Sequence, residues 1–127
     1  MNRILLIGSG YLGQVVARLF LQAGSDIAAI CAHQETQKRL AGRTYPIFTA
    51  DVRSKKALLG VLGQFTDIDL LVFCVSSKGG DEAAYRELYF EGLRNAQEIF
   101  WPRRLLFVSS TSVYGQTCGE WVDETSP

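Results

Sequence analysis

The sequence begins with a short apolar run that stops abruptly at a glycine motif. Residues 3–7 read Arg-Ile-Leu-Leu-Ile, which is typical of a strand buried on both faces. Residues 8–13 read Gly-Ser-Gly-Tyr-Leu-Gly, and apolar residues at helical spacing continue to residue 23. A chain that starts in this way is constrained to a strand, a tight turn and a helix, which is the first half of a βαβ unit.

Strand-like and helix-like segments alternate along the rest of the chain. The expected strands are 3–7, 26–32, 45–49, 69–75 and 105–108, and the expected helices are 12–23, 36–40, 55–65 and 81–100. This alternation predicts an α/β fold, a Rossmann-like doubly wound parallel sheet of about five strands in the order 3-2-1-4-5 with helices on both faces. Residues 109–127 show little periodicity and are expected to form a loop.

Composition limits the classes of function. The 127 residues carry 13 basic and 13 acidic side chains, so there is no net charge to attract nucleic acid or anionic lipid. No apolar stretch approaches the ~20 residues of a membrane helix, and glycines interrupt the first run before it could serve as a signal peptide. Three separated cysteines and one histidine predict neither disulfide nor metal site. We therefore expect one cytoplasmic domain over residues 1–127, with a small-molecule substrate.

Each glycine of the first motif has a distinct expected role in binding a dinucleotide. Gly8 would permit the tight turn, Gly10 would let the backbone approach a pyrophosphate, and Gly13 would let the helix pack close to the strand. The first amides of the helix would then face the phosphates. An ordinary glycine-rich turn is the alternative. The expected cofactor-binding residues of this motif are Gly8, Ser9, Gly10, Tyr11, Leu12 and Gly13.

The end of the second expected strand bears on which dinucleotide is bound. An acid that would hold the ribose of NAD is expected about 20 residues after the glycines, yet residues 31–34 contain none. Its absence permits the 2′-phosphate of NADP, and His33, Lys38 or Arg39 would supply positive charge. The pattern therefore favours NADP over NAD, although all three residues are equally consistent with a solvated surface turn.

Two further strand ends carry candidate cofactor contacts. Asp51, followed by Val52, comes after the third strand and could accept a hydrogen bond from the adenine amino group. It could equally cap the next helix, as could Ser54. Residues 75–80, which read Val-Ser-Ser-Lys-Gly-Gly, follow the fourth strand, and these small residues, Val75 and Ser76 first among them, would let a ribose and a nicotinamide lie against the backbone. A plain loop explains that second segment almost as well.

A run of four hydroxyl residues follows the fifth expected strand. Residues 109–115 read Ser-Ser-Thr-Ser-Val-Tyr-Gly, and a hydroxyl there could bond a substrate carbonyl or alcohol. Ser109 would lie against the cofactor. No G-x-S-x-G motif is present to indicate a serine nucleophile. A serine-rich turn that bonds its own backbone is the alternative.

Taken together, these motifs resemble the NAD(P)-dependent epimerase/dehydratase family of extended or atypical short-chain dehydrogenase/reductases, over nearly the whole chain. The similarity rests on the glycine motif, Asp51-Val52, residues 92–95 and above all residues 109–115. It implies that Ser110 is the catalytic hydroxyl and that Asp51 contacts adenine. It also implies an NADP or NAD cofactor and a substrate such as a sugar nucleotide or another small hydroxyl or carbonyl compound.

The chain also departs from the family pattern. Its glycine loop is one residue shorter than is usual in extended members, and Tyr89 stands where many members have asparagine. The Tyr-x-x-x-Lys pair that completes the family's catalytic site does not occur in the 127 residues. We therefore expect an incomplete cofactor-binding portion that lacks the C-terminal substrate lobe and is inactive by itself.

Two alternatives remain open. A non-catalytic dinucleotide-sensing module would share the glycine motif, but it would give no reason for the hydroxyl run at 109–115. The expected helix 81–100 is rich in apolar residues, which suits a homodimer interface. Packing within a single chain explains the same residues.

Overall fold

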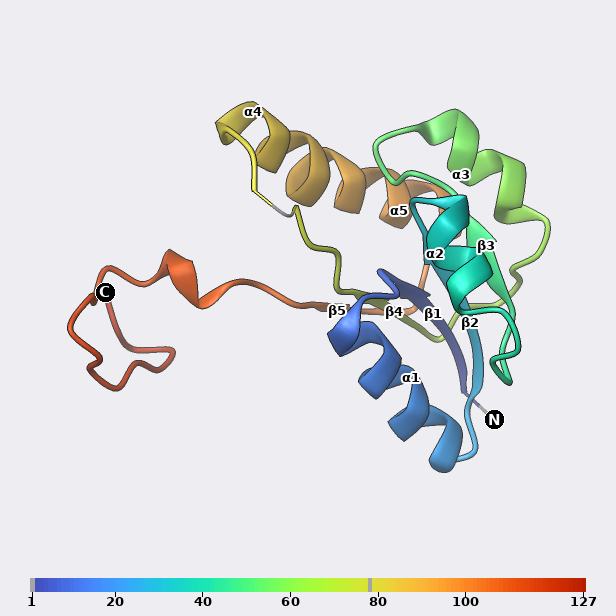
Figure 1. Cartoon of the computed structure of the whole chain (residues 1–127), viewed down its shortest axis with the longest axis horizontal. Coiled ribbons are helices and arrows are strands. Elements are labelled where there is room, and N and C mark those ends of the chain that lie inside the picture. Colours follow the sequence, from blue (N-terminus) through green and yellow to red (C-terminus); the bar gives the residue numbers. More distant parts are fainter. Residues whose placement is uncertain (1, 78) are drawn as a thin grey trace.

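The computed structural model describes residues 2–77 and 79–127, and its centre is a five-stranded parallel sheet with helices against both faces (Figure 1). The strand order is β3-β2-β1-β4-β5, which confirms the predicted topology. In chain order the elements are β1 (Arg3–Ile7), α1 (Tyr11–Gln22), β2 (Asp26–Cys31), α2 (Gln34–Arg39), β3 (Ile47–Thr49), α3 (Lys55–Leu62), β4 (Leu70–Phe73), α4 (Glu82–Tyr85), the π-helical segment η1 (Arg86–Glu91), α5 (Gly92–Phe100), β5 (Arg104–Phe107) and the 3-10 turn η2 (Thr111–Val113).

Strand β1 lies at the centre of the sheet and pairs with β2 on one side and β4 on the other. Leu5, for example, lies in register with Ala28 and with Leu71. Because the chain first winds towards β3 and then crosses back to β4, the strand order reverses between β1 and β4. Open α/β sheets bind ligands at the carboxyl ends of the strands beside such a reversal.

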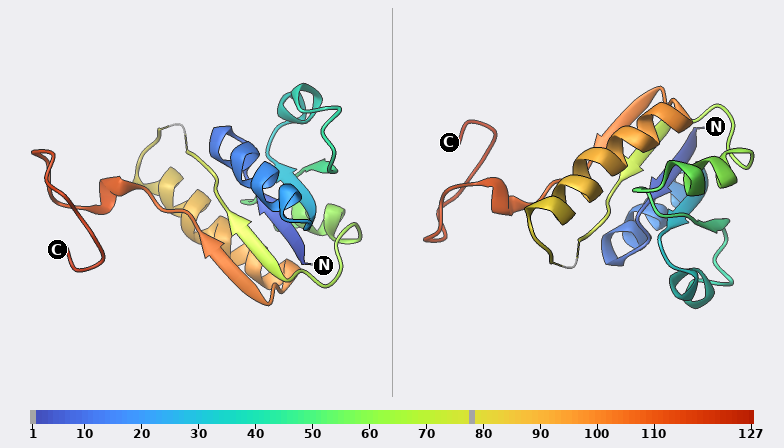
Figure 2. Two further views of the ribbon diagram at one scale, coloured as in Figure 1. Left: turned by 90° about the horizontal axis from the view of Figure 1, so that it is seen from below. Right: turned by 90° about the horizontal axis from the view of Figure 1, so that it is seen from above.

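The alternating side chains of β1 divide the core between the two faces of the sheet. Leu5 and Ile7 are buried in the cluster that α3 and α5 cover, through Leu58 and Phe100 among others. Ile4 and Leu6 belong to the opposite cluster, where α1 contributes Ala17. Figure 2 shows this division, with α1 on one face and α3 and α5 on the other. Apolar burial on both faces explains the continuous apolar runs of the inner strands.

The long helix predicted at 81–100 is continuous, but it is not α-helical throughout. Residues 86–91 form a π-helical segment between α4 and α5. A π turn holds one extra residue, which a 3.6-residue period does not reveal. The other predicted elements are present, with ends that differ from the prediction by at most three residues.

The C-terminal segment is irregular apart from one short turn. Residues 109–127 run away from the sheet (Figure 1). The 3-10 turn η2 begins where the Ser110 hydroxyl accepts a hydrogen bond from the Ser112 N–H. Over residues 2–77 and 79–127, no helix has the length and apolar character needed to span a membrane.

Candidate functional site

A cleft with a volume of about 310 Å³ lies at the carboxyl edge of the sheet, where the strand order reverses. Its walls come from the turn after β1, from the segments that follow β2, β3 and β4, and from the long helix through Ala84 and Leu88. The cleft brings together a majority of the residues predicted to bind a cofactor, namely Gly8, Ser9, Gly10, His33, Arg39, Asp51, Val52, Val75 and Ser76.

Two glycines of the turn are required by close backbone packing. Gly8 has a φ of +105°, and a Cβ there would lie 2.5 Å from the carbonyl oxygen of Cys74. A Cβ at Gly13 would lie only 2.0 Å from the carbonyl oxygen of Gly8. These contacts bring the start of α1 tightly against the turn after β1, as the glycine spacing predicts.

The remaining glycine of the motif, Gly10, and its neighbour Ser9 face a different environment. Gly10 is the N-cap residue of α1, where no side chain of the described residues supplies a cap, and a Cβ there would meet nothing within 4 Å. Ser9 is 3% exposed, yet within the described chain its hydroxyl has no hydrogen-bond partner. An uncapped helix N-terminus, open space and an unsatisfied hydroxyl are the features that a bound phosphate group would use. The turn therefore fits the pyrophosphate of a dinucleotide.

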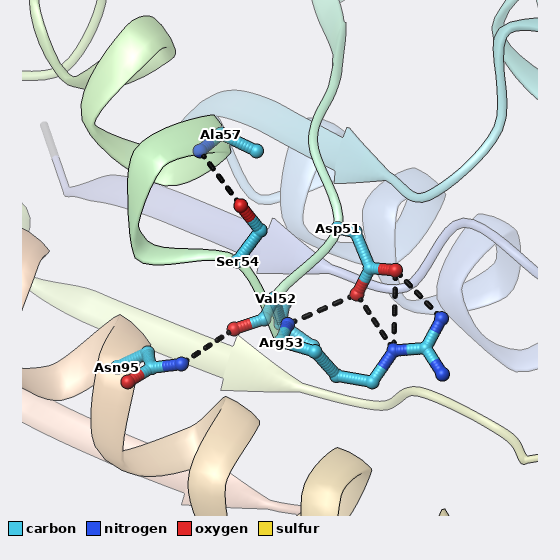
Figure 3. A network of polar contacts seen from close by, with 6 residues as sticks. All are labelled: Asp51, Val52, Arg53, Ser54, Ala57 and Asn95. Carbon is cyan, nitrogen blue, oxygen red and sulfur yellow. Dashed lines mark hydrogen bonds and ion pairs between the residues drawn. The ribbon is translucent and has the colours of Figure 1, made fainter.

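Asp51 is held by a neighbouring arginine and does not cap the next helix (Figure 3). Its carboxylate accepts hydrogen bonds from the Arg53 backbone N–H at 2.9 Å and from the guanidinium, the shortest at 2.6 Å. Hydrogen bonding to Arg53 lowers the pKa of Asp51, and the charge of His33 acts in the same direction. The α3 cap is Ser54, whose hydroxyl accepts from the Ala57 N–H at 3.2 Å. Asp51 is therefore an ionised acceptor at the rim of the cleft.

The turn after β3 is also anchored from below by α5. Buried Asn95 donates its side-chain amide to the carbonyl oxygen of Val52 at 3.0 Å (Figure 3). A Cβ at Gly92, one helical turn earlier, would lie 2.7 Å from a methyl group of Val52. The helix thus fixes Val52 by one hydrogen bond and one close contact, and with it the position of Asp51.

We expect Asn95→Ala to lower the free energy of unfolding by about 2 kcal/mol, since it leaves the Val52 carbonyl without this partner. Urea denaturation would measure the change. Gln97→Ala is the matched control, because Gln97 is exposed on the same helix. Equal stability of the two variants would show that the hydrogen bond contributes nothing.

Several predicted residues do not line this cleft. Tyr11 is 90% exposed and faces a neighbouring cavity beside Arg18 and Arg43. Lys38 lines another cavity, next to Gln37. Three more predicted residues are also absent from its lining, namely Leu12, Ser109 and Ser110. Gly13 does not line it either, and its role is the close packing of backbone against the turn.

The serines after β5 lie beside the cleft but not in its wall. They follow a strand that pairs with β4, so they share the edge of the sheet on which the cleft opens. The Ser110 hydroxyl accepts from the Ser112 N–H at 3.1 Å, which is the local turn that the sequence left open as an alternative. Ser110 is exposed, and a hydroxyl that accepts one bond can still donate its own hydrogen.

The cleft also contains residues that the sequence did not single out. Thr36 and Arg53 line it, as do Cys31 and Cys74, whereas Ser77 belongs to the predicted segment after β4. The Cys74 thiol donates to the carbonyl oxygen of Gly8 at 3.2 Å, and burial raises its pKa to about 11. It is therefore a protonated structural thiol at neutral pH. The place of Arg53, two residues after Asp51, indicates that it lies near the cleft, but it does not predict their ion pair. No group of three potential metal ligands occurs in the part of the chain that is described.

The fold and this cleft are those of a Rossmann-type dinucleotide-binding domain. In this class of domain, a glycine turn lies at the reversal of strand order and leads into a helix N-terminus. The chain belongs to the NAD dependent epimerase/dehydratase family, which it matches over residues 4–127. That match confirms the family resemblance inferred from the motifs. No curated protein sequence matches the chain significantly.

Solved structures share this fold. An NAD-dependent epimerase/dehydratase structure from Methylobacillus flagellatus is 29% identical, with a TM-score of 0.76 over 99% of this chain and 43% of that one. A Bacillus anthracis dTDP-glucose 4,6-dehydratase in complex with NAD is 18% identical (TM-score 0.72; 100% and 44% covered). A yeast methylglyoxal/isovaleraldehyde reductase in complex with NADPH is 16% identical (TM-score 0.71; 88% and 38% covered). The chain thus spans less than half the length of each of these three proteins.

Proposed function

We propose that this chain is the NAD(P)-binding portion of an epimerase/dehydratase-like oxidoreductase. The substrate would be a sugar nucleotide or another small molecule with a hydroxyl or carbonyl group. The observation that carries the proposal is the unsatisfied Ser9 hydroxyl beside the uncapped N-terminus of α1, at the reversal of the sheet. The family match and the cofactors of two similar structures support it.

Different residues around the cleft would bind different parts of the dinucleotide. The amides at the start of α1 and the Ser9 hydroxyl would bind the pyrophosphate, and Asp51 would accept from the adenine amino group. Val75, Ser76 and Ser109 would lie against the nicotinamide ribose. A bound nicotinamide supplies hydride transfer to or from a substrate carbon.

Ser110 would provide a hydroxyl to the substrate, but this chain contains no Tyr-x-x-x-Lys to move the proton. The Ser110 hydrogen would be donated to a substrate oxygen, while its own oxygen accepts from Ser112. A general acid or base is still needed for proton transfer. We therefore propose that the 127-residue chain binds the cofactor without turning over substrate. Measurable oxidoreductase activity of the purified chain would contradict this.

The charges around the cleft favour NADP over NAD. His33, Arg39 and Arg53 line it, and Asp51, already paired with Arg53, is the one acidic residue in its described lining. A 2′-phosphate on the adenine ribose would meet positive charge at the end of β2 without a competing carboxylate. Titration of the chain with NADPH and NADH, followed by fluorescence or calorimetry, tests the proposed binding of a dinucleotide. Failure of both to bind at millimolar concentration would overturn it.

The preference for NADP is tested by removing one cation. Arg39→Ala should weaken NADPH binding about fivefold and leave NADH binding nearly unchanged, because only the 2′-phosphate would be contacted. The matched control is Lys38→Ala, which removes the neighbouring charge outside the cleft. A variant that weakens both cofactors equally would show that Arg39 does not read the 2′-phosphate.

A further inference from the structure

The loop that follows β4 is tied to the long helix by a tyrosine. The backbone N–H of Ser77 donates a hydrogen bond to the hydroxyl oxygen of Tyr89, with a donor–acceptor distance of 3.1 Å. For the described loop residues 75–77 and 79–80, this is the one hydrogen bond recorded to the helix. Since Ser77 lines the cleft, Tyr89 fixes part of the cleft wall without lining the cleft itself.

Tyr89 is well placed to act as a fixed anchor. It lies in the π-helical segment η1, it is half-buried, and its ring centroid is 5.3 Å from that of Tyr85. Leu88, its neighbour in the same segment, lines the cleft. One π turn thus places adjacent side chains against the cleft and against its loop, and π turns are frequent at functional sites.

The position of the loop assigns it to one half of a bound dinucleotide. His33 and Asp51 lie after β2 and β3, on one side of the glycine turn. Residues 75–77 follow β4 on the other side, beside β5 and Ser109. A dinucleotide crosses the sheet at the reversal of strand order. With its adenine half near Asp51, its nicotinamide half would lie against residues 75–77.

We propose that Tyr89 is a positioning residue for the nicotinamide half of the cofactor. Its hydroxyl oxygen accepts a hydrogen bond from the Ser77 N–H and thereby holds the loop after β4 in the shape that forms this wall of the cleft. The inference rests on the proposed dinucleotide-binding function. In this proposal Tyr89 does not contact the cofactor, and it acts only by holding the position of the loop.

Tyr89→Phe tests the inference, because it removes the hydroxyl and keeps the ring. The ligands are NADPH or NADH, whichever the wild-type chain binds more tightly, and the corresponding adenine half, 2′,5′-ADP or AMP. The Kd for the whole dinucleotide should rise about three- to tenfold, while the Kd for the adenine half stays unchanged. The fluorescence of the bound reduced nicotinamide should also shift towards that of the free cofactor.

Tyr85→Phe is the matched control. It removes a hydroxyl from the other ring of the pair, for which the described structure records no hydrogen bond, and it should alter neither Kd. Wild-type affinity of Tyr89→Phe for the dinucleotide would overturn the inference. An equal loss for both ligands, with a lower Tm, would also overturn it by showing a general structural role. A wild-type chain that binds neither ligand would instead overturn the proposed function, and the inference with it.

Discussion

Gly13→Ala should destabilise the fold by about 3 kcal/mol, although it adds a single methyl group. The new Cβ would lie 2.0 Å from the carbonyl oxygen of Gly8 and 3.4 Å from the Cys74 sulfur. The first of these neighbours is backbone, so no side chain can rotate to make room. Either α1 moves away from β1 or the turn deforms, and both changes disturb the packing of Ala17 on the sheet. Urea denaturation followed by circular dichroism measures the loss.

Gly60→Ala controls for the general effect of replacing a helical glycine. Gly60 lies within α3, where a Cβ would meet nothing within 4 Å, so this variant should gain up to about 1 kcal/mol from higher helix propensity. Opposite signs for the two variants would isolate the steric contact at Gly13. If Gly13→Ala were as stable as the wild-type chain, the close approach of α1 to the turn would be wrong.

The sequence predicts the fold because two simple signals agree. Inner strands buried on both faces leave continuous apolar runs, and each run is followed by a helical period. The sheet order and the helices on both faces follow from this alternation and are confirmed. Element ends are less exact, since a strand extends only as far as its backbone pairs with a neighbouring strand. β3, for example, pairs with β2 over only Ile47–Thr49.

The site could be predicted where it follows from the order of the strands, which brings the segments after β1 to β4 to one edge of the sheet, and where backbone geometry depends on residue type. Glycine at positions 8 and 13 follows from the spacing alone, because no other residue fits so close to backbone. The pairing of Asp51 with Arg53 and the contact between Ser77 and Tyr89 depend on side-chain direction, which periodicity does not encode. For the same reason the sequence does not show that Arg39 lines the cleft and Lys38 lines another cavity. Adjacent helical residues point about 100° apart.

Gly10→Val should abolish most dinucleotide binding and leave the fold intact. Gly10 has a φ of −74° and a ψ of −162°, which a β-branched residue adopts readily, and its Cβ position is open. The free energy of unfolding should therefore fall by no more than about 1 kcal/mol, the loss expected from a poorer N-cap residue. The valine methyl groups would instead fill the space above the N-terminus of α1, beside the unsatisfied Ser9 hydroxyl. The Kd for NADPH and NADH should rise about a hundredfold, equivalent to about 2.7 kcal/mol.

Comparison with Gly13→Ala separates the two roles of the glycine motif. If Gly10 borders the pyrophosphate, Gly10→Val loses affinity at nearly constant stability, whereas Gly13→Ala loses stability first. Gly10→Ala should fall between the wild-type chain and Gly10→Val in affinity, because its single methyl group fills less of the same space. Calorimetric titration and thermal unfolding of the same samples provide both readouts. Wild-type affinity of Gly10→Val would place the phosphates elsewhere, and the unsatisfied Ser9 hydroxyl would then need another explanation.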